Sequence, residues 1–363
     1  MSYIKDAVQK FIECSNDRPK AVTGFDGFID VIAKPVKQKL DSGNEYFETI
    51  DEFGEFIKSR AGKSCLIKYD TQIEKLGGNA PIFSLALAKL NSNVELIGAL
   101  GSPEPNKLFA EMPGVNIHSI TEPGITTALE FKDGKIMLSD SRALGEVSYE
   151  TMKNVVGVDK LAEIYSGAGI IGMFNWNDIK NCSILWKNLA EEFLPNAKIA
   201  PNAILSVDLC DVASRSAQDI CEMIDVLRSF KKYCKVVLNV NFNEYSQVYA
   251  ALTGKTAPEN VEESDLIAVT GLDVVCVHLH KGSTAFDASG SATVNTYFIK
   301  NPKISTGGGD NFNAGFTMAV YRGLSLRDCL VVANAVSGFY IKNGHSPEPS
   351  DLLAHAEEWE QNV

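Results

Sequence analysis

The sequence predicts an α/β fold built around a mostly parallel sheet. Six short apolar runs are predicted strands, most of them separated by helix-patterned segments: Ala21 to Thr23, Val94 to Ile97, Gly169 to Phe174, Ile204 to Val207, Val236 to Val240 and Val274 to His278. Strands that alternate with helices are typical of parallel βαβ units. The chain has 363 residues, 45% of them hydrophobic, with no fixed-period repeat or low-complexity linker. We therefore expect one domain over residues 1–363.

Two segments interrupt the alternation of strands and helices. Residues 31–50 form a polar, extended stretch after the first strand, and residues 119–141 contain a predicted hairpin that turns at Asp133-Gly134. Together they predict a small β-sheet outside the main one. Such an appendage could act as a lid that closes over a substrate and excludes water from the reaction.

Charge and composition favour a small-molecule partner. The net charge is −12 and the isoelectric point is near 5.0, which argues against a nucleic-acid partner. No apolar run approaches membrane-spanning length, and the N-terminus lacks the apolar core of a signal peptide, so we expect no membrane partner. The eight cysteines form no Cys-x-x-Cys pair, as expected for reduced thiols in a cytoplasmic protein.

A glycine run and a carboxylate stand at the start of a predicted helix. Thr306 is followed by Gly307, Gly308, Gly309 and Asp310, and then by a long apolar, helix-patterned stretch. The first turn of a helix has unpaired N–H groups and binds anions, and glycines let a phosphate approach the backbone closely. An acidic side chain there would repel a phosphate, which favours a role for Asp310 as a base for an attacking hydroxyl. A purely structural helix cap is the alternative.

A second glycine pair precedes another predicted helix. Gly77, Gly78 and Asn79 come before an apolar helix, while Asp26 and Asp30 follow the first strand. Carboxylates and amides pair well with vicinal hydroxyls, so these segments could form a polyol-binding edge. The alternative is a tight turn capped by Asn79, with Asp26 and Asp30 as solvated loop acids. For Asp26 taken alone we favour that alternative.

Taken together, these residues resemble the ribokinase-like, or PfkB, carbohydrate kinases over nearly the whole chain. The resemblance lies in two signatures in the right order, residues 77–79 with the following helix and IGALG, and residues 306–310 with Phe312 and Gly315. It implies a three-layer α/β/α fold with a β lid, and transfer of the γ-phosphate of ATP, with Mg²⁺, to a sugar hydroxyl. In that family's terms Asp310 is the catalytic base, and Gly307, Gly308 and Gly309 form the anion hole.

The resemblance also implies roles for residues that bind substrate, nucleotide and metal. The implied substrate-binding residues are Asp30, Gly77, Gly78 and Asn79. Nucleotide-binding positions are Asn241, Thr306, Gly309, Asn334 and Gly282, and the magnesium-holding positions are Asn241 and Glu244. As alternatives, Asn334 is an ordinary surface residue of a helix and Glu244 an ordinary acid of a first helical turn. A homodimer through the lid is a further implication.

The chain departs from the family pattern at three positions. Ile82 replaces the second asparagine of the first signature, Ser102-Pro103 replaces a Gly-Asp pair, and Ile304 replaces an acid tied to a monovalent-cation site. The resemblance therefore leaves the sugar, the choice of ATP or ADP, and potassium activation open. A nucleoside kinase of the same fold and a non-catalytic nucleotide- or sugar-binding regulator are the alternative functions.

Overall fold

A nine-stranded sheet forms the centre of the computed structural model, which describes residues 3–14, 18–304 and 306–361. The strand order is β14-β13-β12-β11-β10-β9-β1-β5-β6; neighbours from β12 to β6 run parallel, and β13 and β14 add an antiparallel edge. All six strands predicted from the sequence are present. The strands are β1 (Lys20–Gly24), β5 (Asn93–Ala99), β6 (Val115–Thr121), β9 (Ala168–Met173), β10 (Ile204–Asp208), β11 (Lys235–Asn241), β12 (Val274–His278), β13 (Gly282–Asp287) and β14 (Gly290–Asn295).

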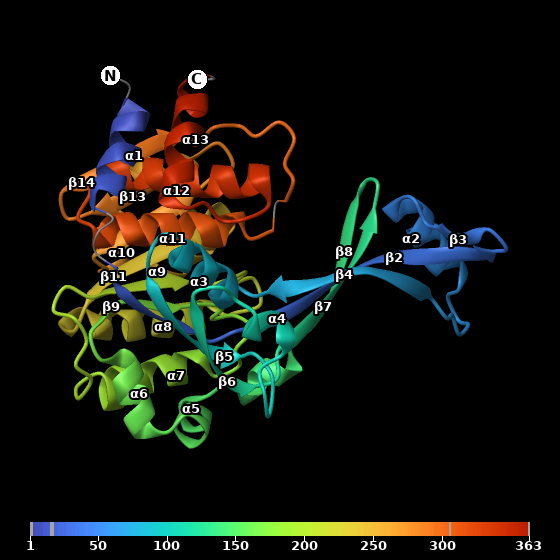
Figure 1. Ribbon diagram of the computed structural model, residues 1–363, viewed down its shortest axis with the longest axis horizontal. Coiled ribbons are helices and arrows are strands. Elements are labelled where there is room, and N and C mark those ends of the chain that lie inside the picture. Colours follow the sequence, from blue (N-terminus) through green and yellow to red (C-terminus); the bar gives the residue numbers. More distant parts are fainter. Residues whose placement is uncertain (1–2, 15–17, 305, 362–363) are drawn as a thin grey trace.

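Helices cover both faces of this sheet, as the three-layer prediction requires (Figure 1). One layer contains α1 (Tyr3–Glu13), α3 (Asn79–Lys89), α11 (Gly308–Tyr321), α12 (Leu326–Asn343) and α13 (Pro349–Gln361). The other contains α5 (Tyr149–Val155), α6 (Val158–Tyr165), α7 (Cys182–Asn188), α8 (Ala217–Ser229), α9 (Phe242–Thr253) and α10 (Leu266–Thr270). The short α4 (Lys107–Ala110) follows β5. Every residue of β9 and β10 is buried, as expected for strands covered on both faces.

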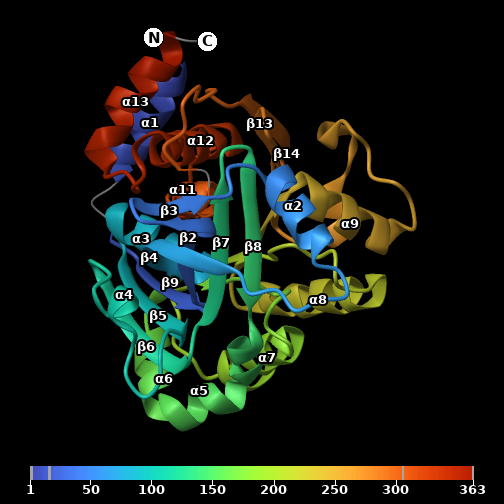
Figure 2. The same cartoon turned by 90° about the vertical axis from the view of Figure 1, so that its right-hand side faces the viewer.

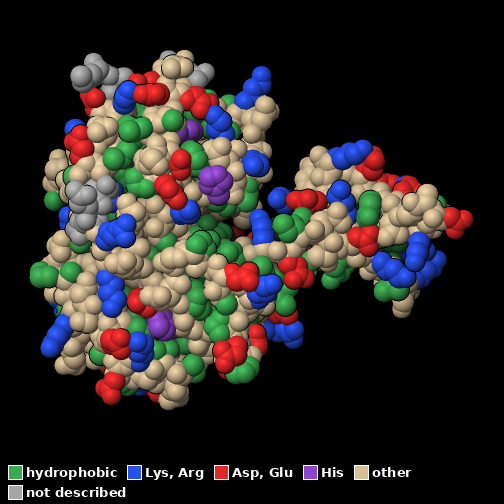
Figure 3. All heavy atoms as spheres, viewed as in Figure 1, with side chains coloured by type: hydrophobic (Ala, Val, Ile, Leu, Met, Phe, Trp, Pro, Cys, Tyr) green, Lys and Arg blue, Asp and Glu red, His purple; other side chains and the backbone are tan. Residues whose placement is uncertain are grey.

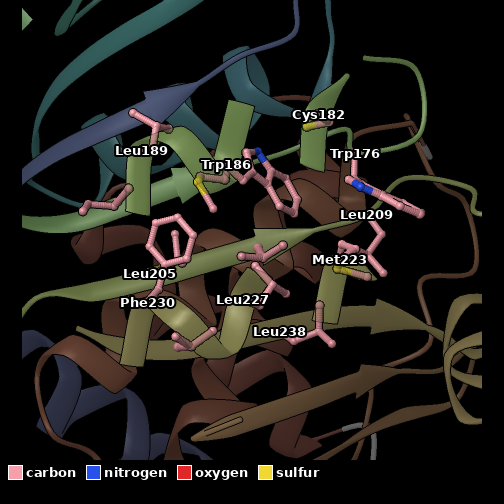
Figure 4. Close-up of a cluster of buried hydrophobic side chains, with 14 of the residues drawn as sticks. Trp176, Cys182, Trp186, Leu189, Leu205, Leu209, Met223, Leu227, Phe230 and Leu238 are labelled. Carbon is pink, nitrogen blue, oxygen red and sulfur yellow. The ribbon is translucent and has the colours of Figure 1, made fainter. Parts of the chain in front are cut away.

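Large apolar side chains hold the second helical layer against the sheet. Trp176, Trp186 and Phe230 are almost completely buried there, next to Leu205 of β10 and Leu238 of β11 (Figure 4). Fully burying a side chain of this size stabilises the fold by about 1.5–3 kcal/mol. This packing fixes the strands whose carboxyl ends carry the polar groups described below.

A second, five-stranded sheet projects from the side of the main body (Figures 1 and 2). Its strands are β2 (Phe28–Leu40), β3 (Gly43–Tyr46), β4 (Lys68–Gly77), β7 (Gly124–Phe131) and β8 (Gly134–Asp140). The predicted hairpin turn is confirmed, because Phe131 pairs with Gly134. The two segments predicted for this sheet contain β3, β7, β8 and all of β2 except its first three residues, but not β4, whose exposed polar residues gave no strand signal.

The small sheet has its own apolar contacts and stands clear of the main body in the space-filling view (Figure 3). The helix α2 (Ile50–Ser59) packs Phe53 against Ala33 and Leu129 of the sheet. Only three residues separate the end of β1 from the start of β2. The small sheet is therefore anchored at the carboxyl end of β1, beside the ends of the other parallel strands.

Candidate active site

Two helices begin at the same place, and a hydrogen bond joins their first turns. The side-chain amide of Asn79, at the start of α3, donates to Asp310 Oδ1 in the first turn of α11 at 2.8 Å. The two residues are 231 positions apart in the sequence. The predicted substrate-binding amide and the predicted base therefore lie in one site.

Asp310 is a buried carboxyl group whose pKa is raised well above its usual range. Burial is the main cause, and the negative charges of Asp208 and then Asp26 add to it, while the hydrogen bond from Asn79 opposes it. A carboxylate with a raised pKa accepts a proton more readily than a solvated one. This is the property that a general base for a hydroxyl group needs.

The surroundings leave little room for a side chain at two of the three glycines before Asp310. Gly307 caps α11 with φ of +90°, a conformation that side chains rarely adopt, and a Cβ there would lie 2.7 Å from the hydroxyl oxygen of Tyr340. At Gly308 a Cβ would meet Ile341 at 3.1 Å, whereas at Gly309 it would make only an ordinary contact with His278 at 3.7 Å. The first N–H groups of α11 are thus presented by bare backbone, as in an anion site.

Asp26 is not the solvated loop acid that the sequence favoured. Its side chain is fully buried and accepts the backbone N–H groups of Asn79 at 2.8 Å and Ala80 at 2.9 Å, and the Asn175 side-chain amide at 3.1 Å. Burial raises the pKa of Asp26 to about 6 despite these hydrogen bonds. Asp26 thus anchors the start of α3 from the loop after β1, and holds Asn79 in place.

Asp30 and Gly77 lie together at the root of the small sheet. A Cβ on Gly77 would come within 2.6 Å of Asp30 Oδ1, so this glycine leaves room for the carboxylate. Burial raises the pKa of Asp30, against the opposing charges of Lys75 and Lys135. Gly78 has φ of +95°, and its Cβ would crowd Asp26. The predicted substrate-binding residues therefore share one corner, between the small sheet and α3.

A cavity of about 740 Å³ opens on the other side of the glycine run. It lies between the carboxyl ends of β11 and β12, the start of α11 and one face of α12, and the chain after β14 forms its rim. Of the residues predicted to bind nucleotide or phosphate, Asn241, Gly282, Gly308, Gly309 and Asn334 line it. Thr306 is exposed and lies outside the lining.

The structure shows Asn334 to be a buried residue, so the surface alternative is wrong. Its side-chain amide donates to the hydroxyl of Ser283 on β13 at 3.0 Å, and only 6% of the residue is exposed. The contact joins α12 to the antiparallel edge of the main sheet. Asn334 therefore stabilises the cavity wall by joining α12 to β13.

Asn241 and Glu244 form a capping box at the start of α9. The N–H of Glu244 donates to Asn241 Oδ1 at 3.0 Å, and the N–H of Asn241 donates to Glu244 Oε2 at 2.9 Å. The structural alternative for Glu244 is thus present in the fold. Burial, followed by the negative charge of Asp208, raises the pKa of Glu244 to about 9.

These two residues fit a magnesium ion held through water. A carboxylate and an amide are the oxygen donors that this cation prefers, and a nearby cation would relieve the charge repulsion that raises the pKa of Glu244. In the part of the chain that the structure describes, no three His, Cys, Asp or Glu side chains gather to hold a metal directly. Magnesium commonly keeps several waters and completes its shell with substrate phosphates.

Sequence reasoning missed Asp208, which ends β10. Its carboxylate accepts the side-chain amide of Asn313 at 2.6 Å and the N–H of Cys210 at 2.9 Å. Burial is the main cause of its raised pKa, and the charge of His278 opposes it. The available signal was that Asp208 directly follows the predicted strand Ile204 to Val207. The carboxyl ends of parallel strands lie at one edge of a sheet, where the other polar groups of the site are also found.

The chain combines a layered α/β/α fold, a small projecting sheet and a buried carboxylate in the first turn of a helix that begins with glycines. This combination defines a sugar kinase of the ribokinase-like class. Solved structures share the fold. Arabidopsis thaliana ribokinase, complexed with ribose and ATP, has a TM-score of 0.63 at 20% identity and covers 94% of this chain and 99% of its own. A mutant of phosphofructokinase-2 from Escherichia coli has a TM-score of 0.65 at 13% identity, covering 95% and 100%.

Within this class the chain belongs to the prokaryotic ketohexokinase family, whose model matches residues 2–359. A ketohexokinase from Haloferax volcanii is 27% identical over 344 residues, which are 94% of this chain and 91% of that protein. The chain is thus a carbohydrate kinase, a phosphotransferase that acts on an alcohol group. Across residues 3–14, 18–304 and 306–361, no helix is long and apolar enough to span a membrane.

Proposed function

We propose that this protein transfers the γ-phosphate of ATP to a hydroxyl of a ketohexose, with Asp310 as the general base. The observation that carries the proposal is the hydrogen bond between Asn79 and Asp310, because it joins the predicted sugar-binding residues to the first turn of α11, whose glycines line the 740 Å³ cavity. The family and the Haloferax volcanii relative support the ketohexose. We assign ATP to the cavity beyond the glycine run, and the Arabidopsis thaliana neighbour, which is complexed with ATP, supports ATP as the donor.

In this mechanism the tasks are divided among the site residues. Asp30 and Asn79 bind sugar hydroxyls, and Asp310 takes the proton of the attacking hydroxyl. Asn79 also orients the carboxylate of Asp310. The N–H groups of residues 307–309 stabilise charge on the transferring phosphoryl group, a role in which losing one donor typically reduces kcat about 10²- to 10³-fold. Magnesium, held near Asn241 and Glu244, would neutralise phosphate charge when bound. The small sheet acts as a lid that excludes water.

The test is ADP release with magnesium-ATP across ketohexoses, aldoses, sugar acids, phosphosugars and nucleosides. We expect turnover with a ketohexose and a fall in kcat of about 10²- to 10⁴-fold in Asp310→Asn, the usual loss for a general base. Turnover with nucleosides alone would instead support a nucleoside kinase. Binding of ATP and sugar without turnover would support a regulator. If Asp310→Asn turned over as fast as the native protein, Asp310 would not be the general base.

We further propose that the protein forms a homodimer through the small sheet. Four apolar side chains of β4, β7 and β8 are about half exposed: Ile73, Ile125, Met137 and Leu138. Strand pairing puts Ile73 and Met137 on one face of the small sheet and Ile125 and Leu138 on the other, and exposed apolar side chains of this kind mark interaction surfaces. Light scattering after gel filtration should give twice the chain mass, and Met137→Lys with Leu138→Lys should give the mass of one chain. A monomeric native protein would contradict this assembly.

A further inference from the structure

Three consecutive carbonyl groups at the entrance to α11 are held by side chains. Each accepts one side-chain hydrogen bond: Thr306 O from the hydroxyl of Tyr340 at 3.1 Å, Gly307 O from the amide of Asn311 at 2.9 Å, and Gly308 O from the hydroxyl of Ser337 at 2.8 Å. Two of the donors come from α12 and the third from α11 itself. These contacts act on the backbone that begins the anion site.

Holding a carbonyl also aims the next N–H group. A peptide unit is planar, and in its trans form the C=O of one residue and the N–H of the next point in opposite directions. Fixing the carbonyls of residues 306, 307 and 308 therefore fixes the N–H directions of Gly307, Gly308 and Gly309. The carbonyls point into the protein, where the side chains bind them. The N–H groups consequently point the opposite way, toward the free N-terminal end of α11.

The three donors are themselves rigidly placed. Tyr340 and Ser337 lie three residues apart on the same face of α12, which approaches α11 so closely that a Cβ on Gly315 would meet Val336 at 3.0 Å. Burial raises the pKa of Tyr340 to about 12, so its hydroxyl remains protonated and donates. Asn311 is fully buried, and its Oδ1 accepts the hydroxyl of Ser346 at 2.7 Å.

We propose that Tyr340, Ser337 and Asn311 are positioning residues that aim the N–H groups of Gly307, Gly308 and Gly309 at the transferring phosphoryl group. The inference rests on the proposed function of the glycine run. It assigns the tuning of the anion site to three side chains, of which Ser337 lines the large cavity and Tyr340 and Asn311 do not. Tyr340 is the most informative of the three, because it lies outside the lining of the large cavity and can be replaced by an isosteric residue.

The first test compares Tyr340→Phe with the native protein. An N–H group that points in a slightly wrong direction still stabilises the phosphoryl group in part. The loss of kcat should therefore be smaller than the loss of about 10²- to 10³-fold that is typical when a donor is removed. We expect kcat to fall about 5- to 50-fold with little change in the KM for sugar. The control is Tyr245→Phe, which removes a hydroxyl that donates to another backbone carbonyl, that of Pro258, at 3.0 Å. That variant should keep the native kcat.

A binding measurement separates positioning from general stabilisation. Aluminium fluoride with ADP and sugar mimics the transferring phosphoryl group, whereas ADP alone does not use the N–H groups in the same way. In Tyr340→Phe the affinity for the fluoride complex should fall by the same factor as kcat, with ADP affinity unchanged. Adding Ser337→Ala, which frees a second carbonyl, should multiply the loss. Thermal unfolding of each variant establishes that it is folded.

The outcomes distinguish this inference from the proposed function. If the native protein turns over and Asp310→Asn does not, but Tyr340→Phe and its combination with Ser337→Ala keep native kcat and fluoride affinity, the positioning role is wrong and the kinase stands. If Asp310→Asn turns over normally, the proposed function itself fails. Should Tyr340→Phe not fold, Ser337→Ala alone decides by the same two readouts.

Discussion

The carboxylate of Asp208 accepts a 2.6 Å hydrogen bond from Asn313, which ties the end of β10 to α11 one turn beyond Asp310. Asp208 thereby brings a second negative charge into the region of the base. After burial, that charge is the largest cause of the raised pKa of Asp310. Asp208, at the end of β10, therefore helps to raise the pKa of Asp310, which lies on α11 more than a hundred positions later in the sequence.

We expect Asp208→Asn to move the acid side of the pH profile of kcat/KM to lower pH. A base acts when it is ionised, so activity falls as the pH drops through the pKa of Asp310. Removing the charge of Asp208 lowers that pKa, and the fall should occur at lower pH. Asp211→Asn, which changes an exposed acid in the same loop, is the control. An unmoved profile would mean that Asp208 does not tune the titrating base.

Asp26 predicts a pH dependence of stability. Its pKa of about 6 in the folded protein lies above its ordinary value of 3.8, so the folded state binds more protons than the unfolded state between these values. The free energy of unfolding should therefore fall as the pH rises from about 4 to 6, by about 3 kcal/mol from this group. Urea unfolding of the native protein and of Asp26→Asn at several pH values should show that the native stability falls by this amount relative to that of the variant over this range. Parallel curves would contradict the prediction.

Replacing Asp30 should affect the sugar and leave the nucleotide alone. Asp30 lies with Gly77 at the corner that we propose binds the sugar, whereas the large cavity is lined by other residues. We expect Asp30→Ala to raise the KM for sugar about 10- to 100-fold, the usual effect of losing charge-assisted hydrogen bonds, with the KM for ATP nearly unchanged. Glu74→Ala, at an exposed acid of β4, is the matched control. If the KM for ATP rose instead, the prediction that Asp30 binds the sugar and not the nucleotide would be wrong.

Two glycine substitutions should separate folding from catalysis. Gly307→Ala forces an alanine to φ of +90° and into Tyr340, so we expect the protein to lose about 1–3 kcal/mol of stability along with activity. Gly309→Ala meets only an ordinary contact and gains helix propensity of up to about 1 kcal/mol, yet it adds a methyl group to the cavity lining where we propose that phosphate binds.

Calorimetry and steady-state kinetics of the two variants provide the measurement. Gly309→Ala should be as stable as the native protein, or more stable, while losing activity. A fully active Gly309→Ala would argue against phosphate binding at this backbone.

The sequence by itself determined the alternation of strands and helices, the hairpin at Asp133-Gly134, and the meeting of a glycine run with Asp310 at a helix start. These are local patterns: apolar periodicity, turn chemistry and a short motif each lie within a few neighbouring residues. They were enough for the fold class and for the two segments that build the core of the site.

Only the tertiary structure decided the surroundings of Asp26, Asp208 and Tyr340, and added β4 to the small sheet. Each of these depends on partners from distant parts of the chain. A carboxylate after a strand looks the same in sequence whether it is solvated or buried against the N–H groups of a distant helix. Burial and long-range hydrogen bonds exist only once the parallel strands place their carboxyl ends side by side, and these contacts set the pKa values and directions on which the chemistry depends.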